Sequence, residues 1–287
     1  MKNLNQFITE YIIKKKLDKP IDSEHKYHPN SKEELIKNIQ ELINNKIYDF
    51  NCIDTREITD MSKLFYNKIF NNINKLNFDV SGWDVSNVIN MSEMFNSCYN
   101  FDCDLSSWDV SNVENMEGMF NNCHNFTGKG LENWNVSKVE ISSFMFIGCE
   151  NFDCDLSKWD IRNIRRMSSM FSYCKKFDGK SIENWDVSNV VSARNMFYKC
   201  ENLNCDLSGW DVNNVTNMTS MFDGCTNFNC DLSNWNVSNV KNMSYLFNGC
   251  KKLNCDLSNW NVKNVTNMLC LFDSCTSLKN KPSWYKE

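Results

Sequence analysis

Proline, glycine and histidine are scarce in this sequence: its 287 residues include 3 Pro, 9 Gly and 3 His. Linkers between domains are commonly rich in Pro, Gly or Ser, so the sequence offers no point at which it divides into independent domains. It also lacks an apolar run of the ~18 residues that a membrane-spanning helix needs. Its first residues lack the uninterrupted apolar region and small-residue cleavage site of a secretory signal. We therefore expect one continuous body with an intracellular location and no membrane contact.

Positive charge is not in excess either, because the formal net charge is −5. A protein that binds nucleic acid by neutralising phosphates needs clustered Lys and Arg, so nucleic acid is not the expected partner. The three histidines are His25, His28 and His124, and none belongs to a recognisable set of nucleophile, base and orienting group. His25 and His28 could bind a metal together with Cys52, but a solvated pair is the simpler interpretation. The sequence predicts no enzyme, cofactor or metal site.

What the sequence does contain is a repeat, which tryptophan marks. Eight Trp recur at intervals of 25 or 26 residues: Trp83, Trp108, Trp134, Trp159, Trp185, Trp210, Trp235 and Trp260. Trp284 lies in a degenerate last rung, and Ile53 takes the Trp position in a first one. A period of this length is typical of solenoids, in which each repeat stacks on its neighbours. We expect a solenoid of about nine to ten repeats over residues 50–287, behind a cap formed by residues 1–49.

Within one repeat, two apolar periods follow each other. Trp108 and Val110 alternate with polar residues, which predicts a short half-buried strand. The next apolar positions are Val113, Met116, Met119, Phe120 and Cys123. This spacing predicts a short helix, because residues three and four apart share a helix face. The sequence therefore predicts an α/β solenoid in which short parallel strands and short helices stack from rung to rung.

The repeat also carries a resemblance to known families. Its strand spacing, L-x-x-W-x-V-x-x-V, matches the leucine-rich-repeat template, and M-F-x-x-C-x-x-F resembles the signature of BspA-like leucine-rich repeats. The full unit, WDVSNVxNMxxMFxxCxxF, looks like the 26-residue repeat of bacterial surface proteins, which also occurs in protists and giant DNA viruses. The resemblance implies protein binding or adhesion on a solenoid and carries over no catalytic residue. If the protein is viral, its expected location is the host cytoplasm.

The N-terminal cap is predicted to contain two amphipathic helices. The first has its apolar face at Leu4, Phe7, Ile8, Tyr11 and Ile12. The second begins at a capping box, Ser31 with Glu34, and its apolar face is Leu35, Ile36, Ile39, Leu42 and Ile43. Since an open solenoid exposes an apolar end, these helices are expected to cover the first rung. The alternative is a separate helix pair that docks a partner.

Thirteen of the fifteen cysteines follow the repeat in two columns, and Cys52 and Cys270 lie outside them. The first column is Cys98, Cys123, Cys149, Cys174, Cys200, Cys225, Cys250 and Cys275. The second is Cys103, Cys154, Cys205, Cys230 and Cys255. A ladder of buried free thiols is the simplest interpretation, since free Cys packs as a small apolar residue. Disulfides between columns or rungs and a zinc site remain alternatives. Cys270 is the expected exposed thiol.

An acidic column follows the Trp column: Asp84, Asp109, Asp160, Asp186 and Asp211 are predicted to lie on the exposed side of the strands. Asn stands at the same place in the other repeats, which favours hydrogen bonding to the following turn. The alternative is a surface that binds cations or basic ligands. The sequence leaves both open.

A basic band interrupts the acidic chain near its middle, where the repeat departs from its consensus. Four of the five Arg, namely Arg162, Arg165, Arg166 and Arg194, fall in two adjacent repeats, with Lys158 beside them. Because Arg binds carboxylates with two parallel hydrogen bonds and is enriched at binding hot spots, we predict a docking site for an acidic protein partner. The alternative is an ordinary solvated patch.

Two classes of function fit this sequence. The first is a non-enzymatic scaffold for protein interactions, between virus or pathogen and host if the resemblance extends to function. The second is a structural or surface component, such as an adhesin-like part of a virion. The expected oligomeric state is a monomer or an end-to-end dimer.

Overall fold

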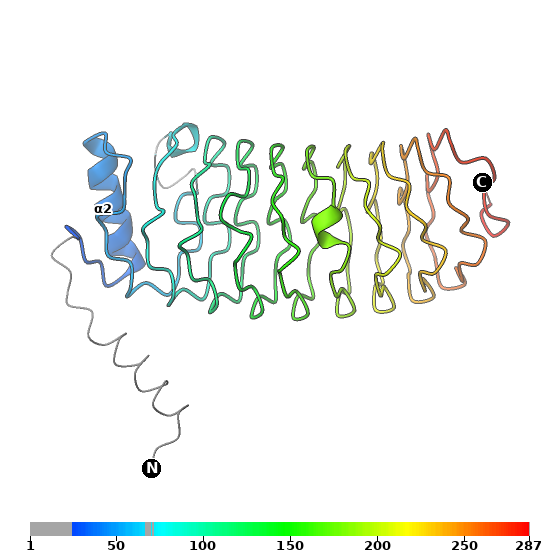
Figure 1. Ribbon diagram of the computed structural model, residues 1–287, viewed down its shortest axis with the longest axis horizontal. Coiled ribbons are helices and arrows are strands. Elements are labelled where there is room, and N and C mark those ends of the chain that lie inside the picture. Colours follow the sequence, from blue (N-terminus) through cyan, green and yellow to red (C-terminus); the bar gives the residue numbers. More distant parts are fainter. Residues whose placement is uncertain (1–24, 67–69, 71, 287) are drawn as a thin grey trace, which may run out of the picture.

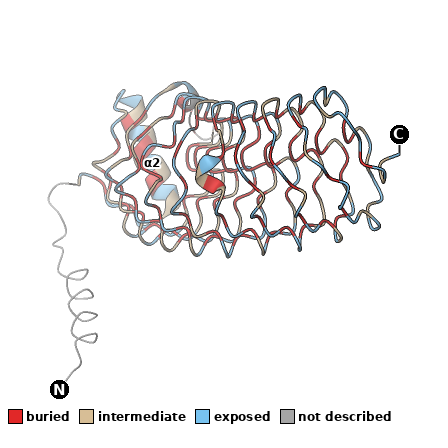
Figure 2. Cartoon of the chain, turned by 45° about the vertical axis from the view of Figure 1, so that its right-hand side comes forward, coloured by how far each residue is buried: buried red, intermediate tan, exposed pale blue. Residues whose placement is uncertain are grey.

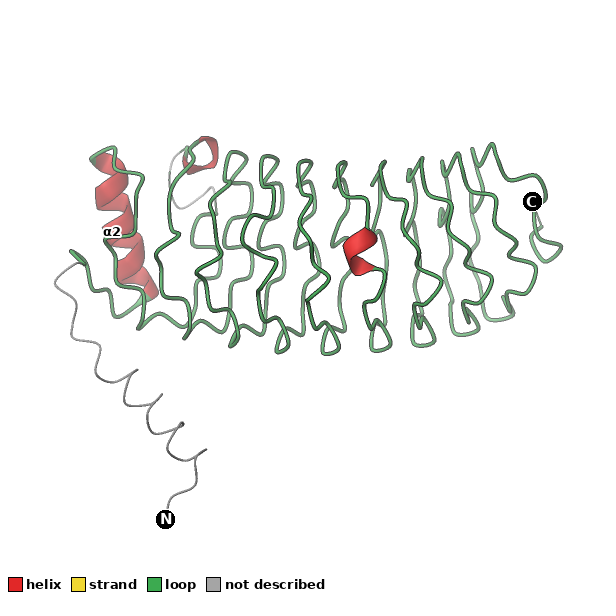
Figure 3. Cartoon of the chain, viewed as in Figure 1, coloured by secondary structure: helices red, strands yellow, loops and turns green. Residues whose placement is uncertain are grey.

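The computed structural model describes residues 25–66, 70 and 72–286, and they form one elongated coil of stacked rungs (Figure 1). Helix α2 (Lys32–Asn44) lies across the N-terminal end of the coil, and the last rungs lie at the opposite end. Two single-turn 3₁₀ helices interrupt the rungs, η1 (Ile73–Lys75) and η2 (Lys180–Ile182). Almost all of the described chain outside these elements is turns and loops (Figure 3). The predicted repeat solenoid is therefore present, but its rungs are not built from strands and helices.

Each rung is a succession of tight turns. In one rung, the amide of Val88 donates to the carbonyl of Val85 (2.9 Å), and that of Cys98 donates to Phe95 (2.9 Å). Bonds from residue i+3 to residue i recur throughout the described rungs, and such bonds define β-turns. The predicted helix is wrong because corners with a positive φ, at Gly118 (φ 59°) and Asn122 (φ 58°), interrupt the segment, whereas an α-helix needs a negative φ at every residue.

The rungs pair in parallel, but at a different place from the one predicted. The paired residues directly precede the position that is Met in most repeats, Ser142 in one and Ala193 in another: Asp60, Asn90, Asn115, Ile141, Arg166, Ser192, Asn217, Asn242 and Asn267. From this point alternate amides donate to the next rung, as in Met91 to Asn115 (2.9 Å) and Glu93 to Glu117 (2.7 Å). The predicted strand around Trp108 and Val110 is not formed. We call the segment from this paired residue to the one before the first-column Cys the ladder side.

Two corners have a positive φ in each of the eight ladder-side segments that begin at Asn90 or later. At the second corner six of the eight positions have a small or turn-forming residue, namely Ser97, Asn122, Gly148, Gly224, Gly249 and Ser274. The remaining two are Tyr173 (φ 61°) and Lys199 (φ 58°). Because L-residues with a side chain are disfavoured in this left-handed region, the backbone selects Gly, Asn and Ser at this corner.

Buried segments, red in Figure 2, recur along the whole length of the coil. The core consists of columns of like side chains. The central Phe of each rung stacks on its neighbours, with ring centroids 5.5 to 5.9 Å apart from Phe65 to Phe272. The indoles of Trp108, Trp134, Trp159 and Trp185 stack at 6.3 to 6.5 Å. A substitution in one rung therefore alters the packing of the rungs on both sides.

Helix α2 closes the N-terminal end of this core. The Ser31 hydroxyl accepts a hydrogen bond from the Glu34 amide (3.2 Å), so the predicted helix start is confirmed. Leu35, Ile39 and Leu42 are buried against the core, while Ile36 and Ile43 are partly buried. Lys32 Nζ also reaches Ser62 Oγ of the first rung (2.8 Å). The predicted helix over residues 4–12 lies outside the described residues.

The opposite end is only partly covered. Trp284 stacks on Trp260 at 6.3 Å, and Tyr285 contacts Phe272 edge to face at 5.1 Å. Val262, Val265 and Met268 nevertheless remain half-buried, and Leu269 is 58% exposed. These positions are buried in most inner rungs, except that of Leu269, which faces outward. The last complete rung thus retains an accessible apolar edge.

Candidate functional site

The first cysteine column is part of the core. Cys98 through Cys250 of this column are buried and free, and Cys275 in the last rung is half-buried and free. Each thiol lies against the carbonyl oxygen of the central Phe in the preceding rung. Examples are Cys123 to Phe95 (3.1 Å) and Cys200 to Phe171 (2.8 Å). Burial raises the pKa of these thiols well above its usual range. They are weak hydrogen-bond donors and not nucleophiles.

The tryptophan column bonds in the same direction. Each indole Nε1 donates to a backbone carbonyl of the preceding rung, at 2.8 to 3.1 Å in every repeat from Trp83 to Trp284. Buried Trp requires such a partner, because an unsatisfied N–H is costly. Trp and Cys therefore recur because each fills the core and also satisfies the backbone of the rung before it.

The remaining cysteines differ in exposure. The second column is buried at Cys103, Cys154, Cys205 and Cys230 and half-buried at Cys255, and all are free. In two rungs Gly128 and Gly179 take this place with φ near 90°, so the column is dispensable there. Cys52 and Cys270 are half-buried. Among the described residues no group of three or more His, Cys, Asp or Glu is placed to hold a metal ion.

The acidic column forms Asx turns. Asp84, Asp109, Asp160, Asp186 and Asp211 each accept a hydrogen bond from the amide two residues on, at 3.0 to 3.3 Å. Hydrogen bonds from the Ser188 hydroxyl and amide lower the pKa of Asp186, and the Arg162 side chain lowers that of Asp160. The local turn thus accounts for this column without any ligand.

An asparagine column that the sequence analysis overlooked links the rungs on the same side. In most repeats the Asn four residues after Trp donates through Nδ2 to a carbonyl of the preceding rung, as Asn112 does to Ser86 (2.7 Å) and Asn214 to Ser188 (2.7 Å). The sequence contains this signal as the constant Asn of the WDVSN unit. Together with the Asx turns it explains why this part of the repeat varies so little.

Part of the predicted basic band is neutralised within the chain. Arg162 makes a two-pronged pair with Asp160, with its Nη2 at 2.7 Å and its Nε at 2.9 Å from the carboxylate oxygens. Lys175 pairs with Glu150 (3.0 Å). Lys158 donates to the Asn133 side chain (2.7 Å) and lies beside the Trp column, away from the ladder side. These residues are exposed but have local partners.

The other three arginines have no such partner. Arg165, Arg166 and Arg194 are exposed, and within the described part of the chain none forms an ion pair. Arg166 begins one ladder-side segment, Arg165 directly precedes it, and Arg194 lies in the ladder-side segment of the next rung. Ser169 donates to the carbonyl of Arg194 (2.8 Å), and Arg166 pairs with Ser192. The structure thus brings together these three of the five residues predicted to bind a partner.

Exposed aromatic residues, which the sequence analysis did not single out, lie on the same side of these two rungs and of the rung before them. Phe144 is 39% exposed and Tyr173 is 36% exposed. Tyr173 contacts Tyr198 edge to face at 5.2 Å, and Lys199 Nζ lies 5.5 and 5.3 Å from the two rings. The signal that could have found them is the departure from Gly, Asn or Ser at the positive-φ corner occupied by Tyr173 and Lys199.

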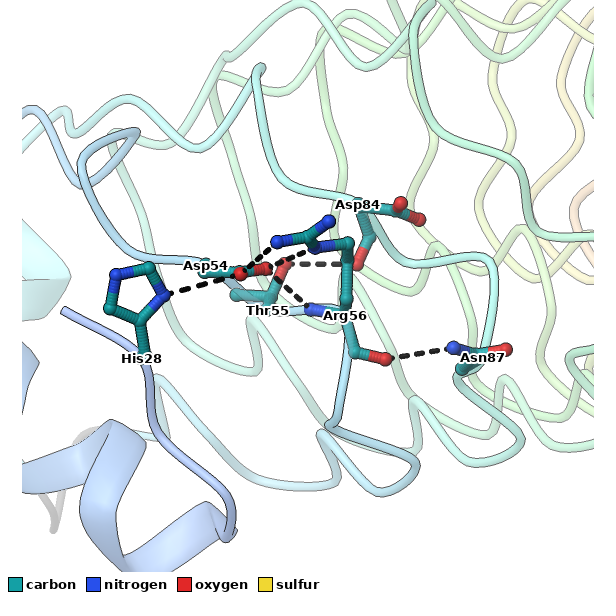
Figure 4. Close-up of polar contacts among 6 residues, drawn as sticks. All are labelled: His28, Asp54, Thr55, Arg56, Asp84 and Asn87. Atoms are coloured by element: carbon teal, nitrogen blue, oxygen red, sulfur yellow. Dashed lines mark hydrogen bonds and ion pairs between the residues drawn. The ribbon is translucent and has the colours of Figure 1, made fainter. Parts of the chain in front are cut away.

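A polar network joins the cap region to the first two rungs (Figure 4). Asp54 accepts hydrogen bonds from Arg56 Nε (2.8 Å) and Nη2 (2.5 Å), and His28 Nδ1 lies 3.3 Å from it. The Arg56 side chain lowers the pKa of Asp54 below its usual range. Asn87 donates to the Arg56 carbonyl (2.8 Å). His25 and His28, whose ring centroids are 6.4 Å apart, thus lie beside a structural ion pair.

A hollow of about 340 Å³ opens between the first rungs, lined by Tyr48, Phe78, Asp79, Asp102 and Asp104. Its carboxylates have partners: Asp79 accepts a hydrogen bond from the Ser81 amide (2.8 Å), and Asp104 pairs with Lys129 (3.0 Å).

No helix of the described chain is both long and apolar enough to cross a membrane.

These features define a class of protein: a repeat solenoid whose rungs are coils of turns held by aromatic, thiol and asparagine columns. The chain belongs to the family described as Mycoplasma protein of unknown function, DUF285, whose model matches residues 32–130, 120–213 and 192–286. No protein with a curated description matches the sequence.

Two solved structures show limited similarity. One is a TLR13–ssRNA13 complex, with 13% identity and a TM-score of 0.30, over 85% of this chain and 44% of that one. The other is a leucine-rich repeat protein from Eubacterium ventriosum, with 13% identity and a TM-score of 0.31, over 88% and 89% of the two chains. The chain spans less than half of the first structure. Scores this low do not identify a shared fold.

Proposed function

We propose that the protein is a non-enzymatic scaffold that binds an acidic protein partner on its ladder side. The observation that carries this proposal is the group of Arg165, Arg166 and Arg194, which are exposed and have no ion-pair partner in the described chain. The chain as a whole has a net charge of −5, so this group is a local exception. Arginine binds carboxylates through two parallel hydrogen bonds, which suits an acidic partner.

The regular core supports a binding role. Repeated Trp, Phe and Cys side chains hold every rung at the same spacing, so outward residues can vary without altering the fold. We place the scaffold in a reducing intracellular compartment, since its fifteen cysteines are all free. The narrower relation to BspA-like leucine-rich repeats of bacterial surface proteins and giant DNA viruses, and a role at a virus–host or pathogen–host interface, belong to the same proposal.

Affinity capture from a host-cell lysate tests the scaffold proposal. The test variant carries Arg166→Glu and Arg194→Glu, and the control carries Lys251→Glu and Lys252→Glu, which change the net charge equally in a distant rung. We expect at least one protein to be captured by the wild type and by the control and to be lost from the test variant. Equal capture by all three would refute docking on the ladder side.

A structural role is the second candidate, and the accessible apolar edge of the last rung favours it. There Val262, Val265 and Met268 are half-buried, although their positions are buried in most inner rungs. Such an edge suits end-to-end association of rods. Sedimentation of the wild type and of a Val265→Lys, Met268→Lys variant tests it: a concentration-dependent dimer that the variant abolishes supports assembly, whereas a monomer in both refutes it.

A further inference from the structure

We propose that three consecutive rungs of the ladder side bind an acidic segment that carries an apolar side chain next to its carboxylates. The surface, here called the docking patch, consists of Phe144, Arg166, Tyr173, Arg194 and Lys199. This inference rests on the proposed scaffold function and narrows the chemistry of its partner.

The members of the docking patch are neighbours through the backbone ladder. Phe144 donates its amide to Ser168 (2.9 Å), two residues beyond Arg166. Ser169 donates to Arg194 (2.8 Å), and Tyr173 donates to Tyr198 (2.7 Å), the residue before Lys199. The patch therefore spans three adjacent rungs, with cations and aromatic rings on the same ladder-side segments.

The patch retains side chains that the backbone disfavours. Tyr173 and Lys199 occupy the positive-φ corner at which the six other rungs have Gly, Asn or Ser. A left-handed conformation costs an L-residue about 1–2 kcal/mol. Both side chains point away from the core, so burial does not offset this cost. Tyr173 and Lys199 are two such exceptions on adjacent rungs, and they lie beside two arginines without ion-pair partners. Because backbone strain is concentrated at functional sites, this combination indicates a binding surface.

The arrangement of the cations sets the spacing of the ligand. Arg166 pairs with Ser192, and Arg194 lies two residues further along, so the two arginines are diagonal neighbours on adjacent rungs. Diagonal neighbours across a ladder are separated by about 7–8 Å. Carboxylates at positions i and i+2 of an extended peptide are about 7 Å apart. The spacing of acidic residues at alternate positions of an extended segment therefore matches the separation of Arg166 and Arg194.

The exposed aromatic residues of the docking patch favour a partner that carries an apolar side chain. Phe144 and Tyr173 are each more than a third exposed, and the Tyr173–Tyr198 pair at 5.2 Å offers a rigid ring edge below Lys199. Aromatic residues beside Arg are the commonest composition of binding hot spots. An apolar side chain flanking the acidic residues would cover these rings and exclude water from the charge pairs.

The surroundings favour a protein segment over single-stranded nucleic acid. Stacking rings beside cations also suit nucleobases. However, Glu117 and Asp223 lie on the ladder side of the two rungs that flank the patch, where they would repel a longer run of phosphates. The chain is also acidic overall. A short acidic peptide meets the two basic rungs and the adjoining Phe144 without crossing these carboxylates.

Selection from a phage-displayed random peptide library on the immobilised full chain tests the inference. We expect enriched peptides to combine alternate acidic residues with at least one aromatic or aliphatic residue. The Kd of a selected peptide should rise about tenfold or more in Arg166→Glu/Arg194→Glu and in Phe144→Ser/Tyr173→Ser, as for loss of hot-spot residues. It should be unchanged in Lys251→Glu/Lys252→Glu.

The outcomes separate this inference from the function on which it rests. Enrichment of acidic peptides without an apolar residue, or indifference to Phe144→Ser/Tyr173→Ser, would overturn the inference and leave the scaffold function standing. No enrichment, or binding indifferent to Arg166→Glu/Arg194→Glu, would overturn both. Displacement of the selected peptides by a uridine 20-mer that binds more tightly would assign the patch to nucleic acid and overturn the inference.

Discussion

Replacement of Cys200 tests whether the cysteine column stabilises the coil through its hydrogen bonds. The Cys200 thiol is fully buried, and its sulfur lies 2.8 Å from the carbonyl oxygen of Phe171. Cys200→Ala removes a buried apolar atom, worth about 1 kcal/mol. It also removes a hydrogen bond worth about 1 kcal/mol. We therefore expect Cys200→Ala to lower the free energy of unfolding by about 2 kcal/mol, and Cys200→Ser, which retains a donor, by about 1 kcal/mol.

Cys205 is the matched control, because it is buried in the adjacent column and its thiol makes no bond to a phenylalanine carbonyl. There Ser should be no better than Ala. Urea unfolding followed by tryptophan fluorescence gives the free energies. Hydrogen exchange of the backbone amides in the surrounding rungs is measured as well, because a solenoid can unfold from one end and the fluorescence change then reports only part of the chain. Equal losses for Ala and Ser at Cys200, or a larger loss for Ser, would refute the bonding role of the column.

Three further predictions concern other parts of the coil. Thiol labelling of the native protein, mapped by mass spectrometry, should modify Cys270 first and the eleven buried thiols only on unfolding; rapid labelling of a first-column Cys would contradict the packing. Gly128→Ala places a Cβ at φ 89° and 2.6 Å from Cys154 Cβ, so it should cost at least about 1–3 kcal/mol. Gly209→Ala, with open space around it, should be neutral in the same urea assay, and equal effects would contradict this. Because Arg56 lowers the pKa of Asp54, their pair stabilises the cap junction above the unfolded-state pKa of about 3.9, and this stability is lost as the pH falls through the lower folded-state value. Asp54→Asn should remove that acid dependence of amide exchange near residue 54; an unchanged profile would argue against the pair.

The repeat and its inward residues could be predicted from the sequence, whereas the local backbone could not. The Trp, Phe and Cys columns are buried, as their period indicates. The segment after Val113 was predicted helical, because i, i+3 spacing is shared by one face of a helix and by the corners of successive turns. The spacing of Val113, Met116, Phe120 and Cys123 fits both, so it does not distinguish a helix from a run of turns. The distinguishing information lies in residues that favour positive φ at fixed places, such as Gly118 and Gly148.

The candidate site was predicted in part. The position of the basic band follows from the sequence, but the sequence does not show which cations are already paired. Arg162 is occupied by Asp160 two residues away, a contact that depends on the Asx turn. The partnership of Tyr173 with Lys199 depends on rung register, which only the stacked structure reveals. Sequence reasoning therefore found the charge and missed the aromatic surface beside it.

Photo-crosslinking from a single position tests the central claim, that a partner docks at the ladder side of the middle rungs. A photoreactive residue replaces Val191, which is 48% exposed and whose amide donates to the carbonyl of Arg165 (3.4 Å). The control replaces Ile89, which occupies the same place in an earlier rung and is 46% exposed. We expect crosslinking to a protein partner in cells from position 191 and none from position 89. Equal crosslinking from both, or from position 89 alone, would contradict it.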